Sequence, residues 1–191
     1  MKPQPLTKKQ ARALVDSAGQ GADGLRNRAL LVLMYRAGLR VSEACRQHAA
    51  DWTPAANGAA VVRVTHPKGE GTWGVHRSIG LDPTAAALVG EWLEIRPANG
   101  PAMFPTSSGR PVHPSHIRRL LRSLAAANGL ERRVHPHCLR HTFARELYDE
   151  NKRIREIQLA LGHSSLATTE TYLISIGATE AVAATIKREK W

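Results

Sequence analysis

Two short segments of this 191-residue chain carry side chains that can act on a phosphodiester. The segment His-Cys-Leu-Arg-His begins at His137 and includes Arg140, and the segment Leu-Gly-His-Ser-Ser includes His163. Tyr172 follows the second segment, and Arg40 lies upstream in Ala-Gly-Leu-Arg-Val-Ser-Glu. Guanidinium and imidazole groups that converge on a phenol supply the charge stabilisation and proton transfer that attack on phosphorus needs. The pattern predicts cleavage of a DNA strand by a tyrosine nucleophile.

Each of these residues also has an ordinary explanation when it is taken singly. An arginine after a helix end, such as Arg40, is usually solvated or caps the helix, and a lysine at a hairpin tip, such as Lys68, is usually solvated. His137 and His141 are four residues apart with Cys138 between them, so zinc ligation is an alternative, but no paired Cys or His motif completes a four-ligand set. Only the ordered combination favours catalysis, and we expect no metal.

The charge of the chain points to a polyanionic partner. Lys and Arg number 27 against 16 Asp and Glu, which gives a formal net charge of +11. No stretch approaches the roughly 20 apolar residues of a spanning helix, and the N-terminus lacks the apolar core of a signal peptide. We therefore expect double-stranded DNA rather than a membrane as the partner, and a cytoplasmic location. The two cysteines are far apart in sequence, so we expect no disulfide.

The elements that must position these side chains are mostly helical. Apolar periodicity and capping residues predict a first helix that Thr7 caps, a buried helix over 25–37, a short helix capped by Ser42, a helix from Pro83 to Ile95 and a basic helix over 116–127. Residues 60–65 and 75–81 predict two strands of a hairpin with its tip near Gly69. The fold class expected is α+β, mainly α, with a small antiparallel sheet.

Helical geometry groups the candidate residues. A period of 3.6 residues places His137, Arg140 and His141 on one face of the helix predicted to begin near residue 136. The next helix is predicted to end at a glycine, which leaves His163 in the turn that follows it. A serine after His163 can cap the last helix, so Tyr172 lies about two turns from that cap and can approach His163.

The motifs in this order resemble those of the tyrosine recombinases, the phage integrase family. The family pattern is Arg, Lys, His-x-x-Arg, His or Trp, and Tyr, and the corresponding residues here are Arg40, Lys68, His137, Arg140, His163 and Tyr172. The likeness extends over roughly residues 7 to 175. It implies the catalytic-domain fold of that family and a site-specific recombinase or integrase that cuts and rejoins DNA through a 3′-phosphotyrosine, with no cofactor.

The resemblance also implies a role for each residue. Tyr172 would be the nucleophile, and Arg40 and Arg140 would clamp the non-bridging phosphate oxygens with paired donors and permanent charge. His163 would add a hydrogen bond to the same oxygens. Glu43 would brace the arginines from behind.

Two further roles concern proton transfer. Lys68 would protonate the departing 5′-oxygen, and His137 would accept the tyrosine proton. The family hairpin commonly reads Gly-Lys-Gly-x-Lys-x-Arg, whereas this chain has a longer segment between Lys68 and Arg77 and lacks the second lysine. Lys68 is therefore the lysine that the hairpin offers.

The domain organisation expected from the resemblance departs from the family pattern at the N-terminus. We expect residues 1–177 to form the catalytic domain and residues 178–191 a tail helix. Only about two dozen residues precede the predicted buried helix, so we expect no separate N-terminal core-binding domain and a weak grip on DNA. In the family the tail docks on a neighbouring protomer, which implies a monomer in solution and a homotetramer on paired DNA sites.

Other functions compatible with this sequence differ in what they would do to DNA. A type IB topoisomerase would relax supercoils with the same chemistry, and a DNA-binding module would bind without turnover. The basic helix carries Arg118, Arg119 and Arg122, which are candidate DNA contacts. Integration, excision, inversion and resolution would share the same residues, and the sequence favours none of them.

Overall fold

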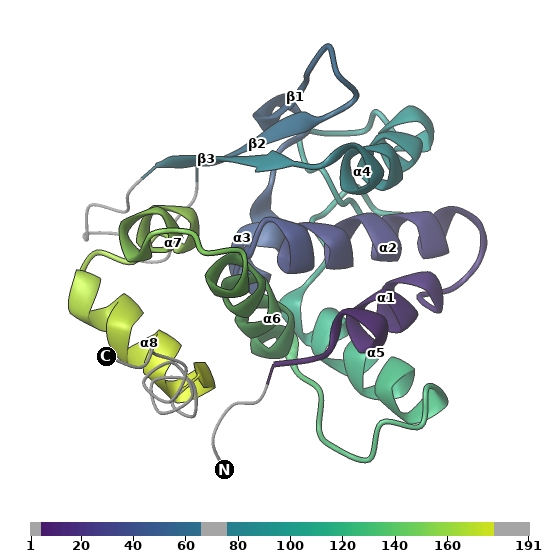
Figure 1. Cartoon of the computed structure of the whole chain (residues 1–191). Coiled ribbons are helices and arrows are strands. Elements are labelled where there is room, and N and C mark those ends of the chain that lie inside the picture. The colour runs from purple at the N-terminus through teal and green to yellow at the C-terminus, as the bar shows by residue number, and fades with distance from the viewer. Residues whose placement is uncertain (1–4, 66–75, 178–191) are drawn as a thin grey trace, which may run out of the picture.

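The computed structural model describes residues 5–65 and 76–177, and in this part of the chain one small sheet lies at the edge of a mainly helical fold (Figure 1). The helices are α1 (Lys8–Asp16), α2 (Gly21–Arg36), α3 (Val41–Arg46), α4 (Pro83–Ile95), α5 (Pro114–Ala127), α6 (Pro136–Asp149), α7 (Ile154–Leu161) and α8 (Leu166–Gly177), with a short 3₁₀ turn at Ala49–Asp51. The strands are β1 (Trp52–Pro54), β2 (Ala60–Val64) and β3 (Arg77–Leu81). This confirms the predicted α+β, mainly helical class.

Helix α2 is the centre of the main core. It packs against α4 on one side and against α1 and α6 on the other, as Figure 1 shows. Its run Leu30-Leu31-Val32-Leu33-Met34 is buried on every side, which is why the sequence is apolar all round the helix rather than along one stripe. The end of α2 therefore occupies a fixed position, and the loop that carries Arg40 follows directly from it.

The sheet is antiparallel in the order β1-β2-β3. Val62 pairs with Ile79, and buried and exposed residues alternate along both β2 and β3, so one face of the sheet contributes to the core. Strand β1 was not predicted, because three residues are too few to show a period. The predicted hairpin tip, with Gly69 and Lys68, lies outside the described residues.

Three predicted helix starts were wrong, and the smallest error is in α5, which begins at Pro114 instead of residue 116. Helix α2 begins at Gly21 instead of residue 25, and its first turn lies so close to the preceding loop that a Cβ on Gly24 would be 2.3 Å from the carbonyl carbon of Gly19. Helix α3 has Arg40 and not Ser42 at its N-cap, because the Glu43 carboxylate accepts the Arg40 backbone N–H at 2.8 Å. The starts of α2 and α3 depend on contacts with Gly19 and Glu43 that the apolar pattern does not reveal.

Other predicted boundaries are confirmed. Thr7 caps α1 in a capping box with Gln10, and α4 runs from Pro83 to Ile95 with the Asp82 carboxylate accepting a backbone N–H at its start. Both cysteines are buried and free. No helix among the described residues is long and apolar enough to cross a membrane.

A second, smaller apolar cluster lies between α6, α7 and α8. Its buried members are Phe143, Ala144, Ile157, Leu161, Leu173 and Ile176. The main cluster is formed by α1 to α5, the sheet and the first part of α6. Helix α6 thus contributes side chains to both clusters, and the elements that carry His163 and Tyr172 belong to the smaller one.

Candidate active site

Arg140 connects three elements at the predicted site. Its buried guanidinium donates hydrogen bonds to the carbonyl oxygens of Gly38, just after α2, and of Leu161, the last residue of α7. A cation is well placed at helix C-termini, where carbonyl groups lack helical partners. Burial, together with the charge of Arg40, lowers the Arg140 pKa to about 9, so the group remains charged at neutral pH.

Glu43 lies at the centre of the arginines. Its fully buried carboxylate accepts the Arg40 backbone N–H at 2.8 Å and the Arg40 guanidinium at 2.9 Å, and it lies 4.0 Å from Arg140. Arg77 donates two further hydrogen bonds to it, at 2.8 and 3.2 Å. Burial raises the Glu43 pKa, but Arg77, the Arg40 N–H and Arg140 together outweigh it and hold the pKa below its usual value. The carboxylate is therefore ionised at neutral pH and holds the guanidinium groups in place.

Arg77 was not predicted to be a site residue, yet it is part of this cluster. It is buried on β3, and its Nε donates to the carbonyl oxygen of Ala160 in α7 at 2.9 Å. The hairpin strand, Glu43 and the end of α7 are thereby fastened together. The signal that could have identified it is its register, because strand alternation with Ile79 places residue 77 on the inward face, where a charge needs a partner.

The ring of Tyr172 contacts the imidazole rings of two histidines. His141 stacks on it with ring centroids 4.8 Å apart and an interplanar angle of 27°, and His163 meets it edge-on at 5.5 Å. Its buried hydroxyl has no hydrogen-bond partner among the described residues. Burial raises the Tyr172 pKa to about 12, although Arg140 and Arg40 act to lower it. The phenol is therefore protonated at neutral pH and lies within the field of both arginines.

His163 lies in the turn between α7 and α8, as predicted. Gly162 ends α7 with a φ of 63°, and a Cβ at that position would lie 2.7 Å from Arg77 Nη1. Burial, with the charges of Arg140 and other nearby arginines, lowers the His163 pKa to about 4. The imidazole is therefore neutral at physiological pH and carries one N–H.

His137 differs from its predicted neighbours. It is exposed in the first turn of α6, whereas Arg140 and His141 are buried, so the three side chains do not form one presented face. The neighbours of His137 on both sides, Pro136 and Cys138, are buried, and the helical period alone does not show which side chain of this first turn remains exposed. The ring centroids of His137 and His141 lie 6.3 Å apart, and it is His141, to which no catalytic role was assigned, that contacts Tyr172.

Arg118, Arg119 and Arg122 are all exposed on α5, whose opposite face buries Ile117 and Leu121. Within residues 5–65 and 76–177, no three His, Cys, Asp or Glu side chains form a group that could hold a metal ion. Lys68 lies outside the described part.

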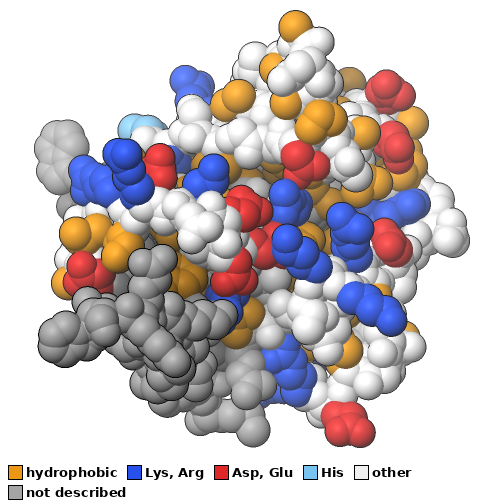
Figure 2. All heavy atoms as spheres, in the orientation of Figure 1, with side chains coloured by type: hydrophobic (Ala, Val, Ile, Leu, Met, Phe, Trp, Pro, Cys, Tyr) orange, Lys and Arg blue, Asp and Glu red, His pale blue; other side chains and the backbone are white. Residues whose placement is uncertain are grey.

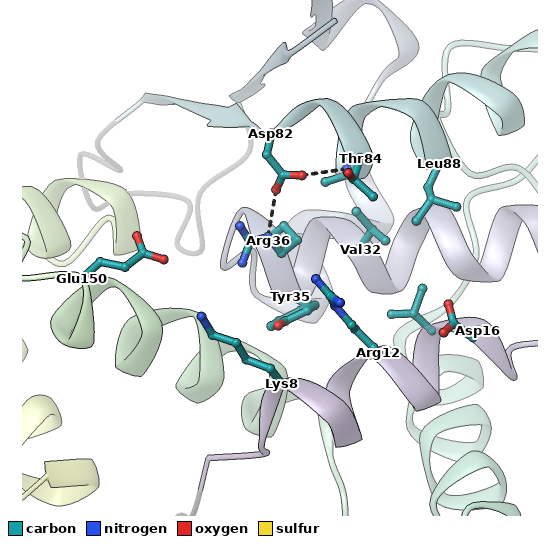
Figure 3. A pocket seen from close by; sticks show the side chains of 12 residues that line it. Lys8, Arg12, Asp16, Val32, Tyr35, Arg36, Asp82, Thr84, Leu88 and Glu150 are labelled. Atoms are coloured by element: carbon teal, nitrogen blue, oxygen red, sulfur yellow. Dashed lines mark hydrogen bonds and ion pairs between the residues drawn. The ribbon is translucent and has the colours of Figure 1, made fainter.

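A pocket of about 560 Å³ lies elsewhere, among α1, α2 and α4 (Figure 3). Arg36 is at its edge and pairs with Asp82 at 3.0 Å and with Glu146 at 2.6 Å. None of the predicted site residues lines it. The face shown in Figure 2 carries Lys and Arg side chains interspersed with Asp and Glu, so it offers no continuous positive surface to a duplex.

Comparison with known proteins decides the family. The model of the phage integrase family matches residues 4–176. The chain belongs to the phage integrase family. Two curated family members with high similarity are tyrosine recombinases XerC, from Mesorhizobium japonicum at 36% identity over 177 residues and from Rhodospirillum centenum at 37% over 177 residues. Each alignment covers 89% of this chain but 54% and 50% of those relatives, so the chain spans about half their length.

Solved structures of the phage integrase family share the fold. The crystal structure of XerA recombinase matches with a TM-score of 0.82 and 26% identity, covering 100% of this chain and 67% of that one. XerH site-specific recombinase bound to palindromic difH substrate, a post-cleavage complex, matches with a TM-score of 0.79 and 26% identity, covering 99% of this chain and 54% of that one.

Proposed function

We propose that this chain is the catalytic part of a site-specific recombinase that cuts and rejoins DNA. The observation that carries the proposal is the position of Tyr172 against His163, in the electrostatic field of Arg140 and Arg40. Membership of the phage integrase family and the similarity to XerH in complex with DNA support it.

The proposed first step is a transesterification at a backbone phosphorus. The Tyr172 oxygen forms a bond to phosphorus, the bond to the 5′-oxygen breaks, and a 3′-phosphotyrosine and a free 5′-hydroxyl result. Arg40 and Arg140 stabilise the negative charge that grows on the non-bridging oxygens, and His163 donates a hydrogen bond to them. The reverse attack by a 5′-hydroxyl rejoins the strand without an external energy source.

Proton transfer accompanies both bond changes. Because the Tyr172 pKa is about 12 in the free protein, the phenol has to lose its proton as it attacks. We propose His137 as the acceptor, with His141 holding the ring by stacking, and Lys68 as the donor to the departing 5′-oxygen. The guanidinium groups of Arg40 and Arg140 supply the positive charge, so the proposed reaction uses no metal and no cofactor.

A nicked suicide duplex tests the proposal. The duplex carries a site selected from a random pool of DNA for binding to the protein, and the short fragment released by cleavage diffuses away, so the adduct accumulates. Tyr172→Phe is expected to bind this DNA normally and to form no adduct, whereas Tyr148→Phe, a change at an exposed tyrosine of α6, is expected to react like the wild type.

Adduct formation on this duplex, together with a plasmid relaxation assay, distinguishes the alternative functions. A wild type that binds DNA but never forms an adduct would be a binding module. A wild type that relaxes any plasmid irrespective of sequence would be a topoisomerase. An adduct of undiminished yield in Tyr172→Phe would show that another residue is the nucleophile.

The DNA contacts of α5 are proposed from exposure and charge. Arg118, Arg119 and Arg122 project from α5 while its apolar face is buried, so they are free to meet phosphate oxygens. Replacing all three with alanine is expected to reduce the slope of log affinity against log salt by up to about 3, since each neutralised phosphate contributes about 0.9. An unchanged slope would place the duplex elsewhere.

We also propose that the protein is a monomer in solution and a homotetramer on paired DNA sites, with residues 178–191 linking neighbouring protomers. A tail of 14 residues offers too little apolar area to offset an association cost of roughly 4–15 kcal/mol without DNA. Sedimentation with and without a two-site duplex tests this. A stable oligomer without DNA, or unchanged assembly after deletion of residues 178–191, would contradict it.

A further inference from the structure

The backbone of His163 is held on both sides of the turn. Its N–H donates to the Gln158 carbonyl oxygen at 3.1 Å, and the Gln158 side-chain amide donates to the His163 carbonyl oxygen at 3.0 Å. Gln158 is itself buried. These bonds fix the backbone position of His163, but they do not determine which of the two imidazole nitrogens carries the proton.

Thr169 contacts the ring itself. Its Oγ1 lies 3.0 Å from His163 Nδ1, and the residue has no exposed surface. A buried hydroxyl requires a hydrogen-bond partner, and the imidazole nitrogen provides one. Thr169 precedes Tyr172 by three residues on α8, so the two side chains lie on the same side of the helix.

The direction of this hydrogen bond matters for the chemistry. A neutral imidazole has one N–H and one acceptor nitrogen, and His163 is neutral because its pKa is lowered to about 4. The oxygens of a phosphodiester only accept. A neutral His163 can therefore help a phosphate only if Nε2 carries the proton, which leaves Nδ1 as an acceptor. The hydroxyl of a threonine can donate a hydrogen bond to an unprotonated Nδ1.

We propose that Thr169 is a positioning residue that donates its hydroxyl hydrogen to Nδ1 of His163 and thereby keeps Nε2–H available for the scissile phosphate. The part that concerns phosphate rests on the proposed function, whereas the hydrogen bond and the tautomer belong to the free protein. Because Thr169 and Tyr172 share one helix, the same bond fixes His163 relative to the nucleophile.

The tautomer can be measured without DNA. In ¹⁵N spectra of the free full-length protein at neutral pH, the ring nitrogens of His163, assigned by their loss in His163→Gln, are expected to show an unprotonated Nδ1 and a protonated Nε2. In Thr169→Val, which keeps the shape and removes the donor, the Nδ1 shift is expected to move toward that of a nitrogen without a hydrogen bond. A protonated Nδ1 in the wild type would overturn the proposal.

Cleavage of the suicide duplex gives a second measurement. At saturating DNA, Thr169→Val is expected to cleave about tenfold more slowly, which corresponds to about 1.4 kcal/mol, with affinity for DNA unchanged. Thr169→Ser keeps the hydroxyl and is expected to restore most of the rate. Thr168→Val removes the exposed hydroxyl of the preceding residue and is expected to behave as the wild type.

A double variant separates a positioning role from a merely structural one. If Thr169 acts through His163, adding Thr169→Val to His163→Ala should cause no further loss of rate. Full additivity, or a wild-type rate in Thr169→Val alone, would overturn the inference while leaving the proposed function intact. Absence of any adduct with the wild type would instead refute the proposed function, and the ¹⁵N spectra would still decide the hydrogen bond.

Discussion

Replacing Glu43 with glutamine tests whether one carboxylate organises the arginine cluster. The change keeps the size of the side chain and removes its charge. Four hydrogen bonds reach the carboxylate, two from Arg40 and two from Arg77, and Arg140 lies 4.0 Å away. A glutamine amide would also direct N–H groups toward guanidinium groups, which cannot accept them.

The expected loss of stability follows from these contacts. Removing one partner of a buried ion pair costs about 3–5 kcal/mol. For a domain of this size each kcal/mol shifts the melting temperature by about 2–4 °C, so Glu43→Gln should melt roughly 6–20 °C below the wild type. Urea unfolding of the free protein at neutral pH measures the loss in the free energy of unfolding, and a thermal scan measures the shift in melting temperature. Glu94→Gln, at an exposed position on α4, is the control and is expected to change little.

The pH dependence gives an independent check. The folded pKa of Glu43 is depressed below its unfolded value of about 4.3, so the stability that the ionised group contributes is present above that pH. It is lost as pH falls through the folded pKa. The difference in the free energy of unfolding between wild type and Glu43→Gln should therefore be largest at neutral pH and should become smaller in acid. A loss below about 1 kcal/mol at neutral pH, or a gap that widens in acid, would refute the reasoning.

Three further predictions concern the site and its frame. Arg40→Ala should slow single-turnover cleavage of the suicide duplex by about 10²-fold, and a wild-type rate would exclude it from the charge clamp. Cleavage in excess EDTA should equal that in plain buffer, and stoichiometric zinc with activity lost on its removal would favour a metal site. Gly38→Ala should lower the free energy of unfolding by about 1–3 kcal/mol, because its Cβ would lie 2.3 Å from Phe143 Cδ1 at a φ of +61°. Gly129 has a similar φ of +65° but no atom within 4 Å of an added Cβ, so Gly129→Ala should lower the free energy of unfolding by less in the same urea titration.

The sequence predicted the parts of the site that depend on spacing within one segment. The turn at His163 and the approach of Tyr172 to it follow from helix ends that glycine marks, and the structure has them where expected. The catalytic roles assigned to these residues stay predictions. The fold class could be predicted because apolar period and caps are local properties.

Contacts between distant segments were harder to predict. Arg77 and Glu43 are 34 residues apart, and only the register of β3 places them together. The stacking of His141 on Tyr172 depends on which residues of α6 are buried, and a helical period does not define this. Two local features were also missed: strand β1 has too few residues to show a period, and the close approach of Gly24 to Gly19 at the start of α2 leaves no mark in the apolar pattern.

The smaller apolar cluster among α6, α7 and α8 gives the two halves of the site different thermodynamic stabilities. Releasing α8 alone exposes few buried apolar side chains, chiefly Leu173 and Ile176, whereas α7 is also held by the hydrogen bonds of Arg140 and Arg77 and Arg40 lies next to the main core around α2. Amide hydrogens of α8 should therefore exchange with solvent through local opening, and those of α2 only through global unfolding. Local opening of α8 would therefore move Tyr172 while Arg77 and Arg140 keep their hydrogen bonds to α7.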